Sequence, residues 1–260
     1  MRHSKIGIFS PGMGALAALH ACQLHAPGHT YHFFSDSFHS PFGNRPIAEI
    51  EEYVKEGILF LAEHRCTTIL IACNTSSLTL PSIQENLPSN IRNNLPIFDI
   101  ISCTLNTLQD LDLSDGIVVF GTQQTIQNGK YNKSNINSPK ISSVFSSKLA
   151  NLIDKEASED EILYEIYDSL KQVLNTETKP ANLLLACTHY SLVYNQILQI
   201  CSELGVGDIN IVDQANIFFD WLPKFEATNS GRLFFSTNGI NQIELTRRIE
   251  RVCGRSVEIV

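Results

Sequence analysis

The sequence predicts an α/β protein built from two domains. Short apolar segments alternate along the chain with longer segments of helical periodicity, which is the pattern of a parallel sheet covered by helices. The segment TTILIA at residues 67–72 is almost entirely apolar or β-branched, as expected of a strand buried on both faces. The number of such segments exceeds what one typical sheet uses, so two sheets and two domains are expected.

The elements follow one another in a regular order. Apolar runs bounded by Gly, Pro, Ser or Asn predict strands at residues 5–9, 31–34, 67–72, 97–101, 117–121, 181–186, 209–212 and 232–235. Helices are expected at residues 15–24, 46–65 and 159–174. The helix at 46–65 has the clearest periodicity, with one apolar stripe made by Ile47, Ile50, Val54, Ile58 and Leu61.

Composition and charge exclude several classes of protein. With 43% hydrophobic and 18% charged residues, the chain is not intrinsically disordered. No apolar run approaches the roughly 20 residues of a membrane span, and the N-terminus lacks a secretory signal. A net charge of −8 without a basic patch argues against a nucleic-acid partner. The seven cysteines form no C-x-x-C pair, so reduced thiols in a cytoplasmic protein and no metal site are expected.

The loop after the first predicted strand is rich in glycine. Its Gly12-x-Gly14-x-x-Ala17 fits the dinucleotide fingerprint, and Asp36 follows the second strand. A nicotinamide or flavin enzyme is therefore one interpretation. The other is that any strand-to-helix loop needs glycine and exposes amides that hold an anion. Because a lone fingerprint has low specificity, we favour the second interpretation.

Two cysteines stand in nearly the same local sequence. Cys73 follows the apolar strand ILIA, and Cys187 follows the apolar strand LLLA. Both therefore lie at the carboxyl end of a strand, where open α/β sheets bind ligands. One such context occurs in each half of the chain, so two facing domains would bring the thiols to opposite walls of one cleft.

Two opposed thiols suggest proton transfer at both faces of one carbon. A thiolate removes the proton, and the other thiol delivers one to the opposite face, which inverts the centre. A free thiol has a pKa near ~8.5, so it needs a neighbouring base or amides to ionise at neutral pH. His189, two residues after Cys187, is the natural base for that thiol.

A set of motifs carries a family resemblance along nearly the whole chain. They are Ile6-Gly7-Ile8-Phe9 with Gly12-x-Gly14, Asp36, Pro41-Phe42-Gly43, Ala72-Cys73-Asn74-Thr75, Gly121-Thr122-x-x-Thr125 followed by Gly129-x-Tyr131, and Cys187-Thr188-His189-Tyr190. With them the chain resembles the cofactor-independent glutamate racemases of the aspartate/glutamate racemase superfamily. The Cys-Asn-Thr and Cys-Thr-His-Tyr pair is the specific part of this resemblance.

The resemblance implies a fold and an activity. The fold is two pseudo-symmetric Rossmann-like α/β domains with the active site in the cleft between them: residues 1–97 with 208–260 carry Cys73, and residues 98–207 carry Cys187. The activity is that of an isomerase that interconverts L- and D-glutamate by two-thiol proton transfer and supplies D-glutamate for peptidoglycan synthesis, hence for cell wall biogenesis and cell shape. Glutamate is then the small-molecule partner, no cofactor or membrane partner is implied, and a homodimer stays open.

The resemblance also assigns roles to residues. Cys73 is expected to act on the D-isomer, Cys187 on the L-isomer, and His189 to assist Cys187. The residues expected to bind the substrate are Ser10, Pro11, Phe42, Gly43, Asn74, Thr75, Thr125 and Thr188.

Three positions depart from the family pattern. The first loop of the family reads Asp-Ser-Gly, where the Asp is thought to support the first cysteine, and this chain has Ser10-Pro11-Gly12. Phe42 replaces a tyrosine. Around residues 144–152, where the family carries an acidic residue, no matching carboxylate is found.

These departures leave two alternatives to a glutamate racemase. The substituted loop residues line the expected pocket, so the substrate could be aspartate or another amino acid. A degenerate homologue could instead serve as a binding or regulatory protein, although that role would not need both thiols.

Overall fold

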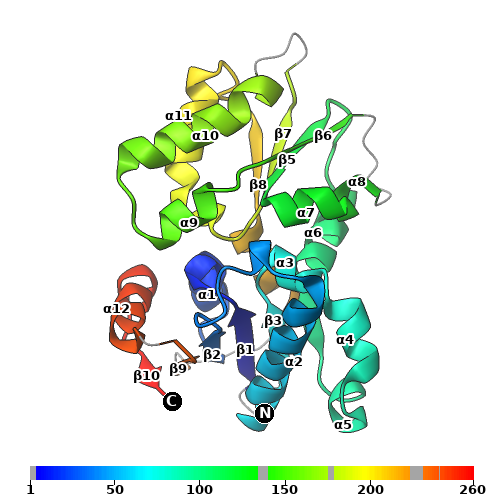
Figure 1. Cartoon of the computed structure of the whole chain (residues 1–260), viewed down its shortest axis with the longest axis vertical. Coiled ribbons are helices and arrows are strands. Elements are labelled where there is room, and N and C mark those ends of the chain that lie inside the picture. Colours follow the sequence, from blue (N-terminus) through cyan, green and yellow to red (C-terminus); the bar gives the residue numbers. More distant parts are fainter. Residues whose placement is uncertain (1–3, 134–139, 175–178, 223–230, 240) are drawn as a thin grey trace. The chain divides into compact units, whose positions relative to one another are not determined.

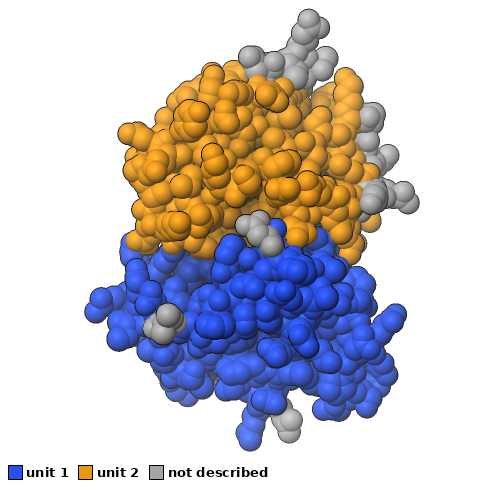
Figure 2. Space-filling model, viewed as in Figure 1, with its two compact units in different colours: residues 1–103, 215–260 blue, residues 104–214 orange. Residues whose placement is uncertain are grey.

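The structure, a computed structural model, describes residues 4–133, 140–174, 179–222, 231–239 and 241–260 (Figure 1). The chain divides into two compact units, which Figure 2 shows in separate colours. Unit 1 comprises Met1–Cys103 and Ala215–Val260, and unit 2 comprises Thr104–Gln214. Each unit has a parallel sheet of its own, so the predicted α/β class with two sheets is confirmed.

Unit 1 contains a six-stranded sheet in the order β10-β9-β2-β1-β3-β4. Its strands are β1 (Lys5–Ser10), β2 (Thr30–Ser35), β3 (Thr68–Ile71), β4 (Ile97–Asp99), β9 (Leu233–Thr237) and β10 (Glu258–Ile259). Its helices are η1 (Met13–Ala15), α1 (Leu16–His25), η2 (Phe42–Asn44), α2 (Ile47–Glu63), α3 (Asn74–Ser77), α4 (Leu80–Asn86), α5 (Ser89–Arg92), η5 (Phe218–Trp221) and α12 (Gln242–Cys253).

Unit 2 contains a four-stranded sheet in the order β6-β5-β7-β8. Its strands are β5 (Ile117–Gly121), β6 (Ile141–Phe145), β7 (Asn182–Ala186) and β8 (Asn210–Asp213). Its helices are α7 (Gln123–Asn128), α8 (Lys130–Lys133), α9 (Leu149–Asp154), α10 (Glu159–Leu174), η3 (Tyr190–Val193) and α11 (Tyr194–Glu203). Helix α6 (Ile100–Gln109) and the short η4 (Gln214–Asn216) run across the two unit boundaries.

The two sheets share one strand order. The first four strands of unit 1 run β2-β1-β3-β4, and the four strands of unit 2 run β6-β5-β7-β8, which is the same 2-1-3-4 arrangement counted within each unit. The chain therefore reverses direction across each sheet after its first two strands. The right-handed crossover rule then places the helix between the first two strands on one face of the sheet and the helices of the later crossovers on the other, and in unit 1 α2 and α4 do pack in one cluster. The carboxyl ends of the two central strands frame a ligand-binding position in each unit.

The core of unit 1 explains why α2 forms where it does. Four of the five residues of its predicted apolar stripe pack with the sheet residues Phe9, Phe34, Ile69 and Ile71. The fifth, Ile47, stands at the start of the helix and is exposed. Gly57 of α2 lies directly over the Phe9 ring, because a Cβ built there would approach the ring carbons to 2.3 Å. Phe9 in turn contacts the rings of Phe34 and Phe42, with centroids 5.9 and 6.4 Å apart.

The predicted domain boundaries need correction. The predicted boundaries after residues 97 and 207 assign residues 98–103 to the second domain and residues 208–214 to the first, which differs from the two units of the structure. β4 pairs with β3, however, and so belongs to the sheet of unit 1. β8 pairs with β7 and belongs to the sheet of unit 2. Among the described residues, none of the helices is long and apolar enough to span a membrane.

Candidate functional site

The carboxyl ends of β1, β2 and β3 bring three sequence-predicted positions of unit 1 to one sheet edge. β1 ends at Ser10, which is in register with Ser35 at the end of β2. The backbone N–H of Asp36 donates to the Ser10 carbonyl at 3.0 Å. On the other side, the N–H of Ala72 donates to the Phe9 carbonyl at 2.9 Å, which places Cys73 beside the same end of β1.

Cys73 occupies the turn between β3 and the short helix α3. Its backbone is extended, with φ −145° and ψ 125°, and its thiol is partly exposed. Both the backbone N–H and the hydroxyl of Ser77 donate to the Cys73 carbonyl, at 2.9 Å each. Asn74 and Thr75 follow immediately and are buried. This backbone position is therefore held by α3, with the thiol left at the end of the strand.

The first loop, at residues 10–15, has no carboxylate. Ser10 is fully buried, and its hydroxyl has no hydrogen-bond partner among the described residues. The hydroxyls of Ser35 and Ser76 are buried and unpartnered in the same way. Pro11 is buried and has no backbone N–H to donate. A buried hydroxyl without a partner costs about 1–3 kcal/mol, so this edge retains unused hydrogen-bonding capacity.

Phe42 and Gly43 lie in the loop between β2 and α2. The Phe42 ring is buried and packs against the rings of Phe9 and Tyr53, with centroids 6.4 and 5.8 Å apart. The ring therefore belongs to the core of unit 1. At Gly43 the space is open, because a Cβ built there would have no heavy atom within 4 Å.

In unit 2 the corresponding edge is formed by the ends of β5 and β7. Gly121 and Ala186 are paired at the last position of the two strands, so Thr122 and Cys187 leave the sheet side by side. Thr122 caps α7, and its hydroxyl lies 3.0 Å from the hydroxyl of Thr125. Thr125, Cys187 and Thr188 are all buried.

Cys187 is the first member of a three-residue array. Its Sγ lies 3.8 Å from Nδ1 of His189. The other ring nitrogen of His189, Nε2, donates to Oδ2 of Asp154 at 3.1 Å. Asp154 is the last residue of α9, so that short helix delivers the carboxylate to the end of β7. A thiol, an imidazole and an orienting carboxylate in this order can move a proton to and from sulfur.

The electrostatics of this array favour a charged imidazole. Burial alone disfavours the charged form of His189 and lowers its pKa. The Asp154 carboxylate, through its charge and its hydrogen bond, and the Cys187 sulfur together outweigh burial, so the pKa lies well above the ordinary 6.5. An imidazolium beside the sulfur stabilises a thiolate at Cys187.

Asp154 supplies a carboxylate two residues beyond the range 144–152, in which the sequence shows none. It is carried by α9, which follows β6, a strand that the sequence pattern does not predict. Nearby, Ser146 donates its hydroxyl to Glu165 at 2.6 Å and accepts the backbone N–H of Leu149 at 2.8 Å. This serine therefore shapes the turn that starts α9.

The remaining cysteines are inert by comparison. Each of them is buried within a helix or next to one. Burial raises the pKa of the Cys22, Cys66, Cys103 and Cys253 thiols to about 12 and that of Cys201 to about 11. These groups stay protonated at neutral pH and pack as small apolar residues.

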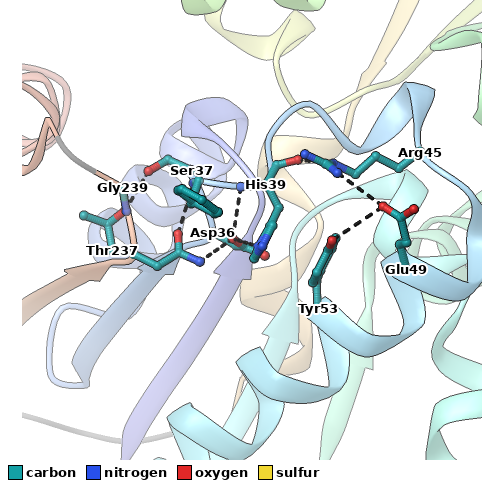
Figure 3. A network of polar contacts seen from close by, with 10 residues as sticks. Asp36, Ser37, His39, Arg45, Glu49, Tyr53, Thr237 and Gly239 are labelled. Atoms are coloured by element: carbon teal, nitrogen blue, oxygen red, sulfur yellow. Dashed lines mark hydrogen bonds and ion pairs between the residues drawn. The ribbon is translucent and has the colours of Figure 1, made fainter.

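Asp36 bears on the dinucleotide interpretation. Its carboxylate is almost fully buried and accepts hydrogen bonds from Nδ1 of His39 at 2.7 Å and Nδ2 of Asn238 at 2.5 Å (Figure 3). A dinucleotide would need this carboxylate for its ribose hydroxyls. Its commitment to protein partners argues against that reading. Within the ranges that the structure describes, no cluster of three His, Cys, Asp or Glu side chains could hold a metal ion.

No family model matches the chain. Its curated relatives and its structural neighbours, in contrast, are proteins of one kind. The glutamate racemase of Thermoanaerobacter sp. (strain X514) is 27% identical over 265 residues, which span 98% of this chain and 95% of that protein. Among solved structures, glutamate racemase isoform RacE1 from Bacillus anthracis superposes with a TM-score of 0.84 at 23% identity, covering 100% of this chain and 97% of that one. The glutamate racemase of Francisella tularensis subsp. tularensis SCHU S4, solved in complex with D-glutamate, gives a TM-score of 0.74 at 21% identity, covering 99% and 97%.

Proposed function

The chain has the aspartate/glutamate racemase fold and its curated homologues are glutamate racemases, and on this premise we propose that it interconverts L- and D-glutamate. The reaction is an isomerisation that uses two cysteine thiols and no cofactor. The product D-glutamate would serve peptidoglycan synthesis in the cytoplasm, as it does in the family that the sequence resembles.

One observation carries the proposal. Cys73 follows β3 and Cys187 follows β7, and these strands hold equivalent places in the two sheets of order 2-1-3-4. Each unit thus contributes one thiol at the position where its sheet would bind a ligand. A pair of equivalent thiols suits a substrate whose two enantiomers are handled by the same steps in opposite order.

The proposed chemistry balances over two proton transfers. A thiolate takes the Cα proton of the substrate and becomes a thiol, which leaves the electron pair on Cα. The thiol on the opposite face then gives its proton to Cα and becomes a thiolate. Cys187 would remove the proton from L-glutamate, and Cys73 would remove it from D-glutamate.

His189 and Asp154 supply the charge balance for Cys187. A positive imidazolium, held by Asp154, stabilises the thiolate before proton removal and stays charged while the thiol forms. The proposed ligands for the substrate carboxylates and ammonium group are Asn74, Thr75, Gly43, Thr125 and Thr188, with Ser10, Pro11 and Phe42 bordering the same site.

The experiment that tests the proposal follows deuterium at Cα. The purified protein is incubated in deuterated water with L- or D-glutamate, and loss of the Cα proton signal and appearance of the other enantiomer are measured. Since enantiomers have equal free energy, both directions must reach the same racemic mixture. Deuteration without inversion, or no exchange with either enantiomer, would refute a glutamate racemase.

Variants at the cysteines assign the thiols. Cys73→Ala and Cys187→Ala should each lower racemisation by roughly 10²–10⁴-fold or more, because each removes one acid–base group. Cys253→Ala, which removes a buried thiol of α12, is the matched control and should retain activity.

A second substrate is favoured by specific positions. Ser10, Pro11 and Phe42 depart from the family pattern and lie at the strand ends and loop of unit 1. The same deuterium experiment should therefore include both enantiomers of aspartate. A larger kcat/KM for aspartate than for glutamate would change the substrate and leave the two-thiol mechanism in place.

A further inference from the structure

We propose that Asp36, His39 and Asn238 are positioning residues that set substrate affinity by fixing the loop that carries Phe42 and Gly43. The inference rests on the proposed function, because the position of this loop matters only if unit 1 binds the amino acid there. The loop spans residues 36–46, between β2 and α2. We call the segment Thr237-Asn238-Gly239, which begins with the last residue of β9, the C-terminal clasp.

Asp36 is the centre of the arrangement. Its carboxylate is 3% exposed and accepts from Nδ1 of His39 at 2.7 Å, from the backbone N–H of His39 at 3.4 Å and from Nδ2 of Asn238 at 2.5 Å. Its own backbone N–H donates to Ser10. A buried carboxylate is tolerated only when donors surround it, so these bonds depend on one another.

The C-terminal clasp closes on the start of the loop. Oδ1 of Asn238 accepts the backbone N–H of Phe38 at 3.1 Å, so this amide bonds to both ends of the turn that Asp36 begins. The hydroxyls of Ser37 and Thr237 lie 2.7 Å apart. Gly239 fits because it has no side chain, since a Cβ there would lie 2.0 Å from the Ser37 hydroxyl. Figure 3 shows the clasp against the loop.

His39 passes this constraint on to the rest of the loop. Its ring stacks on Tyr53 of α2, with centroids 3.7 Å apart and planes 8° from parallel. Its carbonyl accepts from Nε of Arg45 at 2.5 Å, and Arg45 also donates to Glu49 at 3.3 Å (Figure 3). The loop is thus tied to the clasp before residue 40 and to α2 after residue 44.

Phe42 and Gly43 lie between these two anchors. The backbone N–H of Arg45 donates to the Phe42 carbonyl at 3.0 Å, which closes the short helix η2. A shift of His39 is therefore passed to Arg45 and, through the backbone N–H of Arg45, to the Phe42 carbonyl. Because Asp36, His39 and Asn238 bond to one another, their effect on a substrate would pass through the loop. Such an effect weakens the bound substrate and the transition state alike, so it raises KM and leaves kcat unchanged.

The test compares KM and kcat for D- and L-glutamate in variants of the full chain. Asn238→Ala removes both bonds of the amide and should raise KM by roughly 10-fold with kcat within about twofold of the parent. Asn238→Asp has the same shape but sets a second carboxylate against Asp36, so its KM should rise further. Direct binding of D-glutamate, measured by titration calorimetry, should weaken in parallel.

A rescue pair separates positioning from simple destabilisation. His39→Ala should raise KM, whereas His39→Asn should restore much of the affinity, because its amide can donate to Asp36 near the place of Nδ1. Asn94→Ala is the matched control. Asn94 lies in the turn after α5 and its side chain donates to the backbone carbonyl of Asn90 within that helix, so the variant also loses a side-chain hydrogen bond but should leave KM and kcat unchanged.

The outcomes are distinct. An inactive parent protein would refute the proposed function, and the inference would then be judged from calorimetry alone: it is wrong if D-glutamate does not bind the parent, or binds the Asn238→Ala variant equally well. If the parent is active and the Asn238 and His39 variants melt at lower temperature with unchanged KM, the network only stabilises unit 1 and the inference is wrong. A fall in kcat at constant KM would also overturn it.

Discussion

His189 donates to Asp154 across 3.1 Å, although 35 residues separate them in the sequence. This bond and the neighbouring Cys187 sulfur hold the pKa of the imidazole well above 6.5 despite its burial. Asp154→Asn keeps the shape of the side chain but removes its charge, so the pKa of His189 should fall. The rate from L-glutamate should decrease, but by less than the roughly 10²–10⁴-fold effect of losing an acid–base group. The pH at which His189 loses its proton, and above which this rate falls, should become lower. NMR titration of the imidazole, together with pH–rate profiles in both directions, measures the effect.

The same bond predicts how stability depends on pH. A group whose pKa is higher in the folded state binds its proton more tightly there, so protonation stabilises the fold. This contribution is complete below the ordinary pKa of 6.5 and is lost as the pH rises through the raised value. The free energy of unfolding of the parent should therefore fall, relative to Asp154→Asn, as the pH is raised above 6.5. Urea unfolding at a series of pH values tests this, and a constant difference between the two proteins would contradict the charged pair.

Ser10 predicts an asymmetry between the two directions. Cys187 has an imidazole and a carboxylate at hand, whereas position 10, which carries a carboxylate in the family, holds a buried hydroxyl without a hydrogen-bond partner in the described part of the chain. Ser10→Asp should raise kcat from D-glutamate first, by ~10²-fold if proton removal by Cys73 limits the rate. Burying the new carboxylate should at the same time lower stability by more than the about 1–3 kcal/mol that an unsatisfied neutral polar group costs.

A second variant takes account of Pro11, the residue next to Ser10. Pro11 restricts the loop, so Ser10→Asp with Pro11→Ser is the fairer comparison. In each variant, any difference in kcat between the two directions must be balanced in KM, because the equilibrium constant between enantiomers is one. If neither variant changes the rate from D-glutamate while Cys73→Ala abolishes it, another group activates Cys73.

Gly57 predicts a substitution that is destabilising although it improves helix propensity. Alanine is favoured over glycine in a helix by about 1 kcal/mol. Its Cβ would lie 2.3 Å from the Phe9 ring, which is fully buried between Phe34 and Phe42. Overpacking of this kind costs about 1–3 kcal/mol, so Gly57→Ala should lower the melting temperature on balance. Gly207→Ala, where a Cβ meets ordinary contacts at 3.6 Å, is the control and should melt like the parent.

Turnover is expected to need neither metal nor organic cofactor, because two thiols supply both the acid and the base. Dialysis against a chelator should leave kcat unchanged, and addition of zinc, pyridoxal phosphate or a nicotinamide should not increase it. Activity that disappears on chelation and returns with metal would defeat this prediction. Tight copurification of a nucleotide would revive the dinucleotide interpretation of the glycine loop.

Much of the fold could be predicted from periodicity, because the buried strands are continuously apolar. β5, at Ile117–Gly121, and α10, at Glu159–Leu174, have the predicted bounds. β6 (ISSVF) was missed, since it is an edge strand that is only partly buried and carries two serines. α12 was missed because most of its residues are polar and only Ile249 and Cys253 are buried.

The site was predictable to the extent that its chemistry is local in the sequence. Cys187 and His189 are two residues apart, and each cysteine directly follows a strong strand signal. Asp154 belongs to the same array but reaches it through α9, behind the unpredicted β6. Likewise, Asn238 bonds to Asp36 only because β9 pairs with β2. A local sequence pattern cannot predict a contact between residues so far apart in the chain.

The discontinuity of unit 1 has a consequence for how the chain is made. During synthesis, unit 2 emerges whole while the sheet of unit 1 still lacks β9 and β10. Until β9 is made, β2 is an edge strand, and the backbone groups of its apolar residues Tyr31, Phe33 and Phe34 are free to pair with another chain. The nascent protein therefore has an unpaired, aggregation-prone edge strand while the ribosome translates unit 2. Binding of a chaperone to this strand should end once the segment that contains β9 has left the ribosome.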